Sequence, residues 1–120
     1  MAENYTEQRP WGSFTVLLDS DLCKVKSITV NPGQRLSLQL HHHRQEHWTI
    51  IAGTGEVTLN EAIHVVAPGD SVIIPAETKH RVANTGTEPL IFIEIQRGSY
   101  FGEDDIVRFQ DDYNRMTETA

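Results

Sequence analysis

The chain has 120 residues, the size of one domain, and its 17 acidic and 10 basic residues give a formal net charge of -7. This acidic balance argues against non-specific nucleic-acid binding, which depends on a basic surface. No apolar stretch reaches the length of a transmembrane helix, so no membrane partner is expected. The polar N-terminus lacks the pattern of a signal peptide, and the single cysteine, Cys23, cannot form an intrachain disulfide. We therefore expect a cytoplasmic protein.

Short apolar runs alternate with clusters of Gly, Pro, Asn and Asp along most of the chain. These residues favour tight turns, and the runs between them show no helical period. The pattern predicts an all-β fold, an antiparallel sandwich or barrel. The expected strands are Phe14–Leu18, Cys23–Val30, Arg35–Leu40, His47–Ala52, Glu56–Leu59, Ala62–Val66, Ser71–Ile74, His80–Ala83 and Leu90–Gln96.

The two ends of the chain carry a different pattern. Residues 1–8 are interpreted as a polar arm and residues 116–120 as a tail, on either side of a domain at residues 9–115. The acidic segment 103–115 suits either a short helix or one more strand, because Ile106, Val107 and Phe109 stand among its charged residues.

Strand alternation gives two of the expected strands a polar face. Ser37, Gln39 and His41 lie on one face and the leucines between them on the other. In the last strand, Glu94 and Gln96 lie opposite a row of isoleucines. We expect both polar faces to look into the lumen of a small barrel.

Four residues are the candidate metal ligands: Gln39, His41, Glu46 and His80. Gln39 and His41 are two apart, so a strand points both to one side, and antiparallel pairing would bring Glu46 back beside them. His80 begins a later strand. Imidazole nitrogen and side-chain oxygen are zinc donors. The residue types alone also allow a solvated loop of histidines.

The spacing of these residues resembles the two-part cupin signature. Its first part is Gly33-x5-Gln39-x-His41-x4-Glu46-x6-Gly53, and its second is Gly69-x5-Pro75-x-Glu77-x2-His80-x3-Asn84. The chain differs at Gln39, where cupins usually have histidine, and at Glu77, where they usually have glycine. The resemblance implies a single cupin, an RmlC-like jelly-roll β-barrel of two antiparallel sheets.

Longer stretches resemble the type II phosphomannose isomerase domain: RPWG at 9–12, PGQRLSLQLHHHRQEHW at 32–48, IPAETKHRVANTG at 74–86 and IEIQRGSYFGEDDIVRFQDDYNR at 93–115. That domain is usually the C-terminal part of a bifunctional enzyme that is also a mannose-1-phosphate guanylyltransferase. No Gly-rich nucleotide-binding stretch precedes the cupin here, so nucleotidyl transfer is not expected.

The resemblance implies a site, a cofactor and a partner. Gln39, His41, Glu46 and His80 would bind a divalent metal, with zinc expected first and Mn²⁺, Co²⁺, Ni²⁺ or Fe²⁺ as alternatives. The ligand would be a small sugar phosphate. Because cupins often dimerise, we also expect a homodimer.

The implied reaction interconverts mannose 6-phosphate and fructose 6-phosphate, and it needs a base that moves a proton between C1 and C2. Glu94 is the first candidate for that base and His43 the second. The candidates for phosphate binding are Arg44, Lys79, Arg81 and Arg97, each of which could instead be a surface cation. Two other functions stay open: a cupin enzyme for another small sugar or sugar phosphate, and a non-catalytic module that binds sugar or metal.

Overall fold

The computed structural model describes residues 4–113, which form eleven strands and no helix. Within this range no helix therefore has the length and hydropathy needed to cross a membrane. The strands are β1 (Tyr5–Arg9), β2 (Gly12–Asp19), β3 (Cys23–Val30), β4 (Leu38–Leu40), β5 (Arg44–Ala52), β6 (Gly55–Leu59), β7 (Ala62–Val66), β8 (Ser71–Ile74), β9 (His80–Ala83), β10 (Leu90–Gly98) and β11 (Val107–Gln110).

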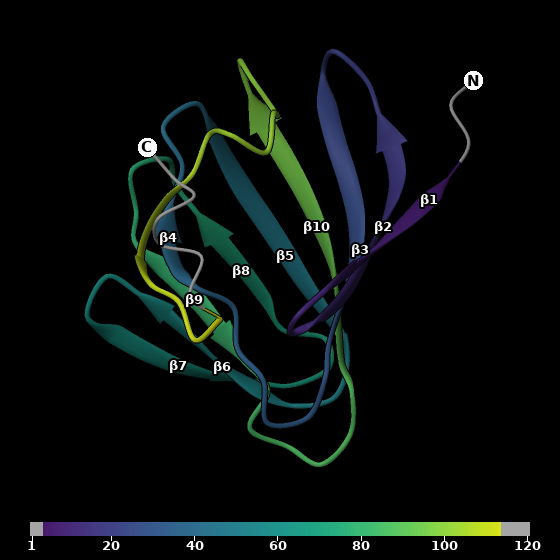
Figure 1. Cartoon of the computed structure of the whole chain (residues 1–120), viewed down its shortest axis with the longest axis vertical. Helices are drawn as coiled ribbons and strands as arrows, with labels where there is room; N and C mark the ends of the chain where they lie inside the picture. Colours follow the sequence, from purple (N-terminus) through teal and green to yellow (C-terminus); the bar gives the residue numbers. More distant parts are fainter. Residues whose placement is uncertain (1–3, 114–120) are drawn as a thin grey trace.

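The strands form two facing sheets (Figure 1). The larger sheet has the order β1-β2-β3-β10-β5-β8 and the smaller one β11-β4-β9-β6-β7, with antiparallel pairing throughout. Strands distant in sequence, such as β3 and β10, become neighbours, and the chain returns repeatedly from one sheet to the other. The expected all-β barrel of two antiparallel sheets is confirmed.

Two expectations about the elements need correction, and one open alternative is decided. The part of the polar arm that the structure describes includes β1, which pairs with β2 over Tyr5–Arg9, so these polar residues form an edge strand. The strand expected at Arg35–Leu40 is only Leu38–Leu40, because Arg35 meets β9 through a single bridge to Ala83. For segment 103–115, where a helix and a strand were both open, the described residues form the strand β11. The expected tail at 116–120 lies outside the described residues.

Two turn positions show why particular residues are needed there. Gly53 has a φ of 82°, and a Cβ at this position would lie 2.4 Å from the carbonyl oxygen of Pro89, so only glycine fits. Asn60 joins β6 to β7 with a φ of 54°, a conformation that asparagine tolerates better than most residues.

The barrel interior is apolar at one end and polar at the other. The change falls at the same level on β3 and β10, where Glu94 pairs with Lys26, and one inward-facing position further along on β5, where Trp48 pairs with Glu94 and Glu46 with Gln96. The apolar half contains Ile28, Val30, Trp48, Ile50, Leu90 and Phe92, and the polar half contains Lys24, Lys26, Arg44, Glu46, Glu94 and Gln96. Burying so many polar groups is costly unless they are paired, so this half of the barrel is where a functional site is expected.

Candidate metal centre and active-site cavity

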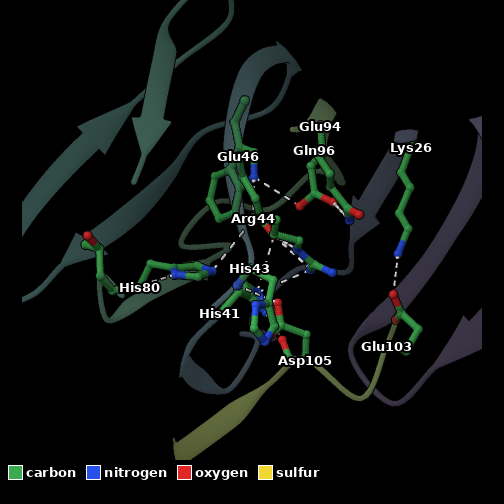
Figure 2. A network of polar contacts seen from close by, with 12 residues as sticks. Lys26, His41, His43, Arg44, Glu46, His80, Glu94, Gln96, Glu103 and Asp105 are labelled. Carbon is green, nitrogen blue, oxygen red and sulfur yellow. Dashed lines mark hydrogen bonds and ion pairs between the residues drawn. The ribbon is translucent and has the colours of Figure 1, made fainter. Parts of the chain in front are cut away.

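The structure brings His41, Glu46 and His80 together inside the barrel, with their candidate ligand atoms within 4.8 Å of one another (Figure 2). His41 follows β4, Glu46 lies on the inner face of β5, and His80 begins β9. Nε2 of His41 is 3.3 Å from Oε2 of Glu46, and Nε2 of His80 is 3.7 Å from its Oε1. All three side chains are buried.

Backbone carbonyls orient both imidazoles. Nδ1 of His41 donates to the carbonyl of Asp105 at 2.5 Å, and Nδ1 of His80 donates to the carbonyl of Thr78 at 2.9 Å. Each ring therefore directs the lone pair of its Nε2 towards Glu46. A histidine held in this way is the usual form that ligates a metal.

Burial keeps the imidazole of His41 neutral. Burial, followed by the nearby Arg44 and His80, lowers the pKa of His41 to about 3. Nε2 of His80 is buried and has no hydrogen-bond partner among residues 4–113. A buried nitrogen without a partner, beside a neutral imidazole and a carboxylate, fits a divalent metal ion, so the chemistry of these donors matches the expected cofactor class.

The position of Gln39 is consistent with a role as the fourth metal ligand. Its Cα is paired with that of His80 across β4 and β9, so both side chains project from the same face of the sheet. Gln39 also lines the same cavity as His41 and Glu46. Its role stays a prediction.

Arg44 lies at the centre of the polar half of the barrel. Its Nη2 is 2.8 Å from Oε2 of Glu46, and it also donates to Nε2 of His41 at 3.3 Å. Its Nη1 is buried and has no hydrogen-bond partner in the part of the chain that the structure describes. The guanidinium therefore balances the charge of Glu46 and keeps one donor available for a ligand.

A cavity of about 160 Å³ runs beside this cluster. Apolar residues form one part of its wall and polar or charged residues the other. The lining residues are Arg9, Trp11, Phe14, Lys26, Ile28, Leu36, Ser37, Gln39, His41, Arg44, Glu46, Trp48, Glu94, Glu103, Ile106 and Arg108.

Glu94, the first candidate for the base, faces this cavity. Nε1 of Trp48 donates to its Oε2 at 3.1 Å and Nε2 of Gln96 donates to its Oε1 at 2.6 Å, so both carboxylate oxygens are held in place. Burial and the neighbouring charge of Glu46 raise the pKa of Glu94 to about 7. A carboxyl group that titrates near neutral pH can both accept and donate a proton.

Four other predicted site residues lie away from the cavity lining. His43 is exposed, with its ring 6.3 Å from that of Tyr100. Lys79 is exposed with its Nζ over the ring of Phe109. Arg81 is buried and donates to the carbonyl of Leu36, which joins β9 to the segment before β4.

Arg97 is on the outer face of β10, because strand alternation turns it away from its neighbour Gln96. Its Nε donates to Nε2 of His47. Arg44 is thus the one predicted phosphate ligand among the cavity-lining residues of the described chain.

Sequence reasoning missed three cations that line the cavity: Arg9, Lys26 and Arg108. The signal for Lys26 was present, because alternation in Cys23–Val30 places it on the same face as Ile28, which is in the core. For Arg108 no local pattern distinguishes the cavity face from the solvent face of β11. Asp105, whose carbonyl orients His41, was likewise visible only as one acid in an acidic segment.

Comparison with known proteins gives a family match over residues 1–111, to the family described as "Mannose-6-phosphate isomerase C-terminal". The alginate biosynthesis protein AlgA of Pseudomonas aeruginosa is 48% identical over 119 residues, which cover 98% of this chain and 25% of that protein. The mannose-1-phosphate guanylyltransferase ManC of Salmonella typhimurium is 45% identical over 108 residues, 90% of this chain and 22% of that protein. The chain thus spans about a quarter of the length of these relatives.

Solved structures support the same fold. An uncharacterised conserved protein from Klebsiella pneumoniae with a double-stranded β-helix domain is 26% identical, with a TM-score of 0.72 over 81% of this chain and 83% of that one. Rru_A2000 of Rhodospirillum rubrum, described as a cupin-2 domain, is 21% identical, with a TM-score of 0.71 over 85% of this chain and 78% of that one. The expected cupin jelly roll is confirmed.

Proposed function

The chain belongs to the family of mannose-6-phosphate isomerase C-terminal domains, and from this premise we propose that it is a metal-dependent isomerase of mannose 6-phosphate and fructose 6-phosphate. One observation carries the proposal: a carboxyl group that titrates near pH 7, Glu94, lines the same cavity as His41 and Glu46 of the candidate metal centre. Aldose–ketose isomerisation needs both a proton carrier and a group that polarises the carbonyl.

Gln39, His41, Glu46 and His80 would hold the divalent ion, which we propose to be zinc. Two imidazoles, one carboxylate and one amide oxygen suit a non-redox metal. When bound, the ion supplies a Lewis acid that polarises the sugar carbonyl. The partnerless Nε2 of His80 supports this assignment.

Glu94 carries the proton in this mechanism. In its ionised form it removes the proton from C2 of the open-chain aldose, which leaves an enediolate with its charge on O1. In its protonated form it returns that proton to C1, while the hydroxyl proton passes from O2 to O1 and the carbonyl forms at C2. The hydrogen bonds from Trp48 and Gln96 restrict the carboxylate to one orientation, so both transfers occur at the same place.

Arg44 is proposed to stabilise negative charge as it develops on the substrate oxygens. Its partnerless Nη1 is a charged donor in a buried setting, where such a hydrogen bond is stronger than in water. The same guanidinium holds the carboxylate of Glu46 in place through its Nε at 3.0 Å.

The direct test measures interconversion of the two sugar phosphates by the purified chain after metal removal and after addition of zinc or another divalent ion. We expect activity to return with metal, and His41→Ala to lose both bound metal and turnover. Absence of turnover with every divalent ion, in protein that demonstrably binds metal, would contradict the isomerase assignment.

A second candidate function is a domain that binds sugar or metal without turnover. The observation that favours it is the guanidinium of Arg44, which already engages Glu46 and Nε2 of His41. Tight binding of metal and sugar phosphate without any conversion of the sugar would support this second function over the first. A panel of other sugars and sugar phosphates separates both from a cupin enzyme of different specificity.

A further inference from the structure

Lys26 is a buried cation on the inner face of β3, and its surroundings raise the question of what it binds. Its side chain is 5% exposed, and its Nζ lies 4.1 Å from the ring centroid of Phe14. The hydrogen bonds and ion pairs within residues 4–113 give this ammonium one carboxylate partner, Glu103, whose Oε2 is 3.0 Å away. A buried ammonium needs such a counter-charge, because burial without one is costly.

Glu103 differs from the other carboxylates of the cavity in where it comes from. It lies on the connection between β10 and β11, which crosses from the larger sheet to the smaller one, and its side chain is 52% exposed. Glu46 and Glu94 stand inside strands and have donors of their own in Arg44, Trp48 and Gln96. The counter-charge of Lys26 is therefore a side chain that can rotate into solvent.

The position of the Lys26–Glu103 pair relative to the candidate metal centre suits the binding of the phosphate end of a sugar phosphate. Lys26 and Glu103 lie on the far side of Arg44 from His80 (Figure 2), and both line the cavity together with Glu94. The guanidinium of Arg9 stacks on the same Phe14 ring at 4.9 Å and adds a second cation. In mannose 6-phosphate the reacting carbons and the phosphate are at opposite ends of the molecule, and Lys26 and His80 of the candidate metal centre likewise lie on opposite sides of Arg44 (Figure 2).

We propose that Lys26, with Arg9 beside it, binds the phosphate end of the substrate, and that the carboxylate of Glu103 occupies this anion subsite until a phosphate displaces it. The proposal rests on the proposed function for the identity of the substrate, whereas binding of inorganic phosphate tests it without turnover. Displacement requires only rotation of the Glu103 side chain. The neighbouring Asp105 fixes the loop, because its carboxylate accepts the backbone N–H groups of His42 and His43.

The charges support an exchange of anions. Burial would raise the pKa of Glu103, but the ammonium of Lys26 and, more weakly, the guanidinium of Arg44 outweigh it and hold that pKa below its usual value. Glu103 is thus an ionised carboxylate that occupies the position of an anion. A phosphate carries more charge and more acceptor oxygens than one carboxylate. It can therefore replace Glu103 at Lys26 and keep acceptors for Arg9, which lines the same cavity and whose guanidinium now contacts Glu7 at 3.1 Å.

The test is calorimetric titration of the full chain with inorganic phosphate, on the wild type and on Glu103→Gln, Asp104→Asn and Lys26→Met. Glu103→Gln removes the internal competitor, so phosphate should bind about tenfold more tightly, the factor expected for one charge-assisted hydrogen bond. Lys26→Met should weaken binding at least about tenfold for the same reason. Asp104→Asn makes the same charge change one residue away, where the carboxylate contacts Tyr100 instead, and should change the affinity little.

The proposal is overturned if Glu103→Gln binds phosphate no more tightly than Asp104→Asn, which would make the Lys26–Glu103 pair a fixed structural contact. It is also overturned if Lys26→Met binds phosphate as the wild type does. Near-ultraviolet circular dichroism of the buried tryptophans reports folding, and if Lys26→Met does not fold, the comparison of Glu103→Gln with Asp104→Asn decides alone.

A further arm separates this proposal from the proposed function. Phosphate that binds at the candidate metal centre should be lost in His41→Ala, whereas phosphate that binds at Lys26 should persist. The expected pattern of affinities without sugar-phosphate turnover would uphold the anion subsite and reject the isomerase. Turnover of the sugar phosphates without the expected pattern of phosphate affinities would uphold the isomerase and reject the anion subsite.

Discussion

At the scale of single residues, the pKa and the orientation of each polar group in the site depend on the residues that contact it. Glu94 illustrates this, because its raised pKa comes from burial and from the charge of Glu46, while Trp48 and Gln96 fix its orientation. Strand alternation in the sequence identified Glu94 as a lumen residue. Alternation carries no information on the tertiary neighbours that set a pKa, so its titration near neutral pH could not be predicted.

Glu94→Gln tests the proposed proton carrier. The amide keeps the size of the side chain but cannot accept the proton, so we expect kcat to fall about 10²- to 10⁴-fold, the usual contribution of a general base. Metal content should stay unchanged. Because ionised Glu94 is the base, kcat/KM of the wild type should decline as the pH falls through about 7.

A bound cation favours the ionised carboxylate and would move this decline to lower pH, never to higher pH. Glu94→Asp is the matched variant, since it keeps a carboxylate and shortens its reach, and it should retain part of the activity. A decline at the same pH in the residual activity of Glu94→Gln would exclude Glu94 as the titrating group.

At the scale of elements, alternation predicted which faces of the strands look inward but not where the strands begin and end. The sequence predicted a strand from His47, because the run Arg44-Gln45-Glu46 is polar. The structure starts β5 at Arg44, since Arg44 and Glu46 face a polar lumen and not solvent. Tyr5–Arg9 escaped prediction for the related reason that an edge strand needs no apolar face of its own.

The loops limited the prediction of the site more than the strands did. His43 and Lys79 are close in sequence to the candidate ligands His41 and His80, yet both are exposed. Lys26 is distant in sequence and lies in the cavity, because β3 and β10 are neighbours. Motif spacing located the candidate ligands, whereas the cations around them follow from a sheet order that the sequence did not reveal.

The β10–β11 connection is predicted to control metal affinity through Asp105. Its carboxylate accepts the backbone N–H groups of His42 and His43, both at 3.0 Å, and its carbonyl accepts Nδ1 of His41. Asp105→Ala removes the two side-chain contacts and lets the loop that carries His41 move. We expect zinc affinity to fall about 10- to 100-fold, as for other groups that orient a ligating histidine.

Competition with a chromophoric chelator measures this affinity. Asp104→Asn is the matched control, because its side chain contacts Tyr100 and neither of the His42 and His43 N–H groups. Equal zinc affinity in the wild type and Asp105→Ala would mean that the loop is held by its other contacts, such as the backbone hydrogen bond from Ser99 to the carbonyl of His43.

At the scale of the whole molecule, the expected homodimer stays a prediction, and the outer face of the larger sheet is where it can be tested. Ile73 on the edge strand β8 and Ile95 on β10 are 59% and 39% exposed and lie on either side of His47 of β5, and Ile51, further along β5, is 53% exposed. Several exposed apolar side chains on one sheet face are typical of an interface, and an edge strand can pair with a second copy.

Light scattering of the wild type should therefore give twice the monomer mass, and Ile73→Glu should shift it to the monomer, because burying an unpaired carboxylate in an apolar interface is unfavourable. Ile63→Glu is the matched control: Ile63 is 63% exposed on β7 of the smaller sheet, so it receives the same charge outside the predicted interface.

A dimer that Ile63→Glu disrupts and Ile73→Glu does not would place the contact on the smaller sheet. A monomeric wild type would reject the dimer, and the cavity would then have to function within one chain, as its lining by residues of a single copy allows.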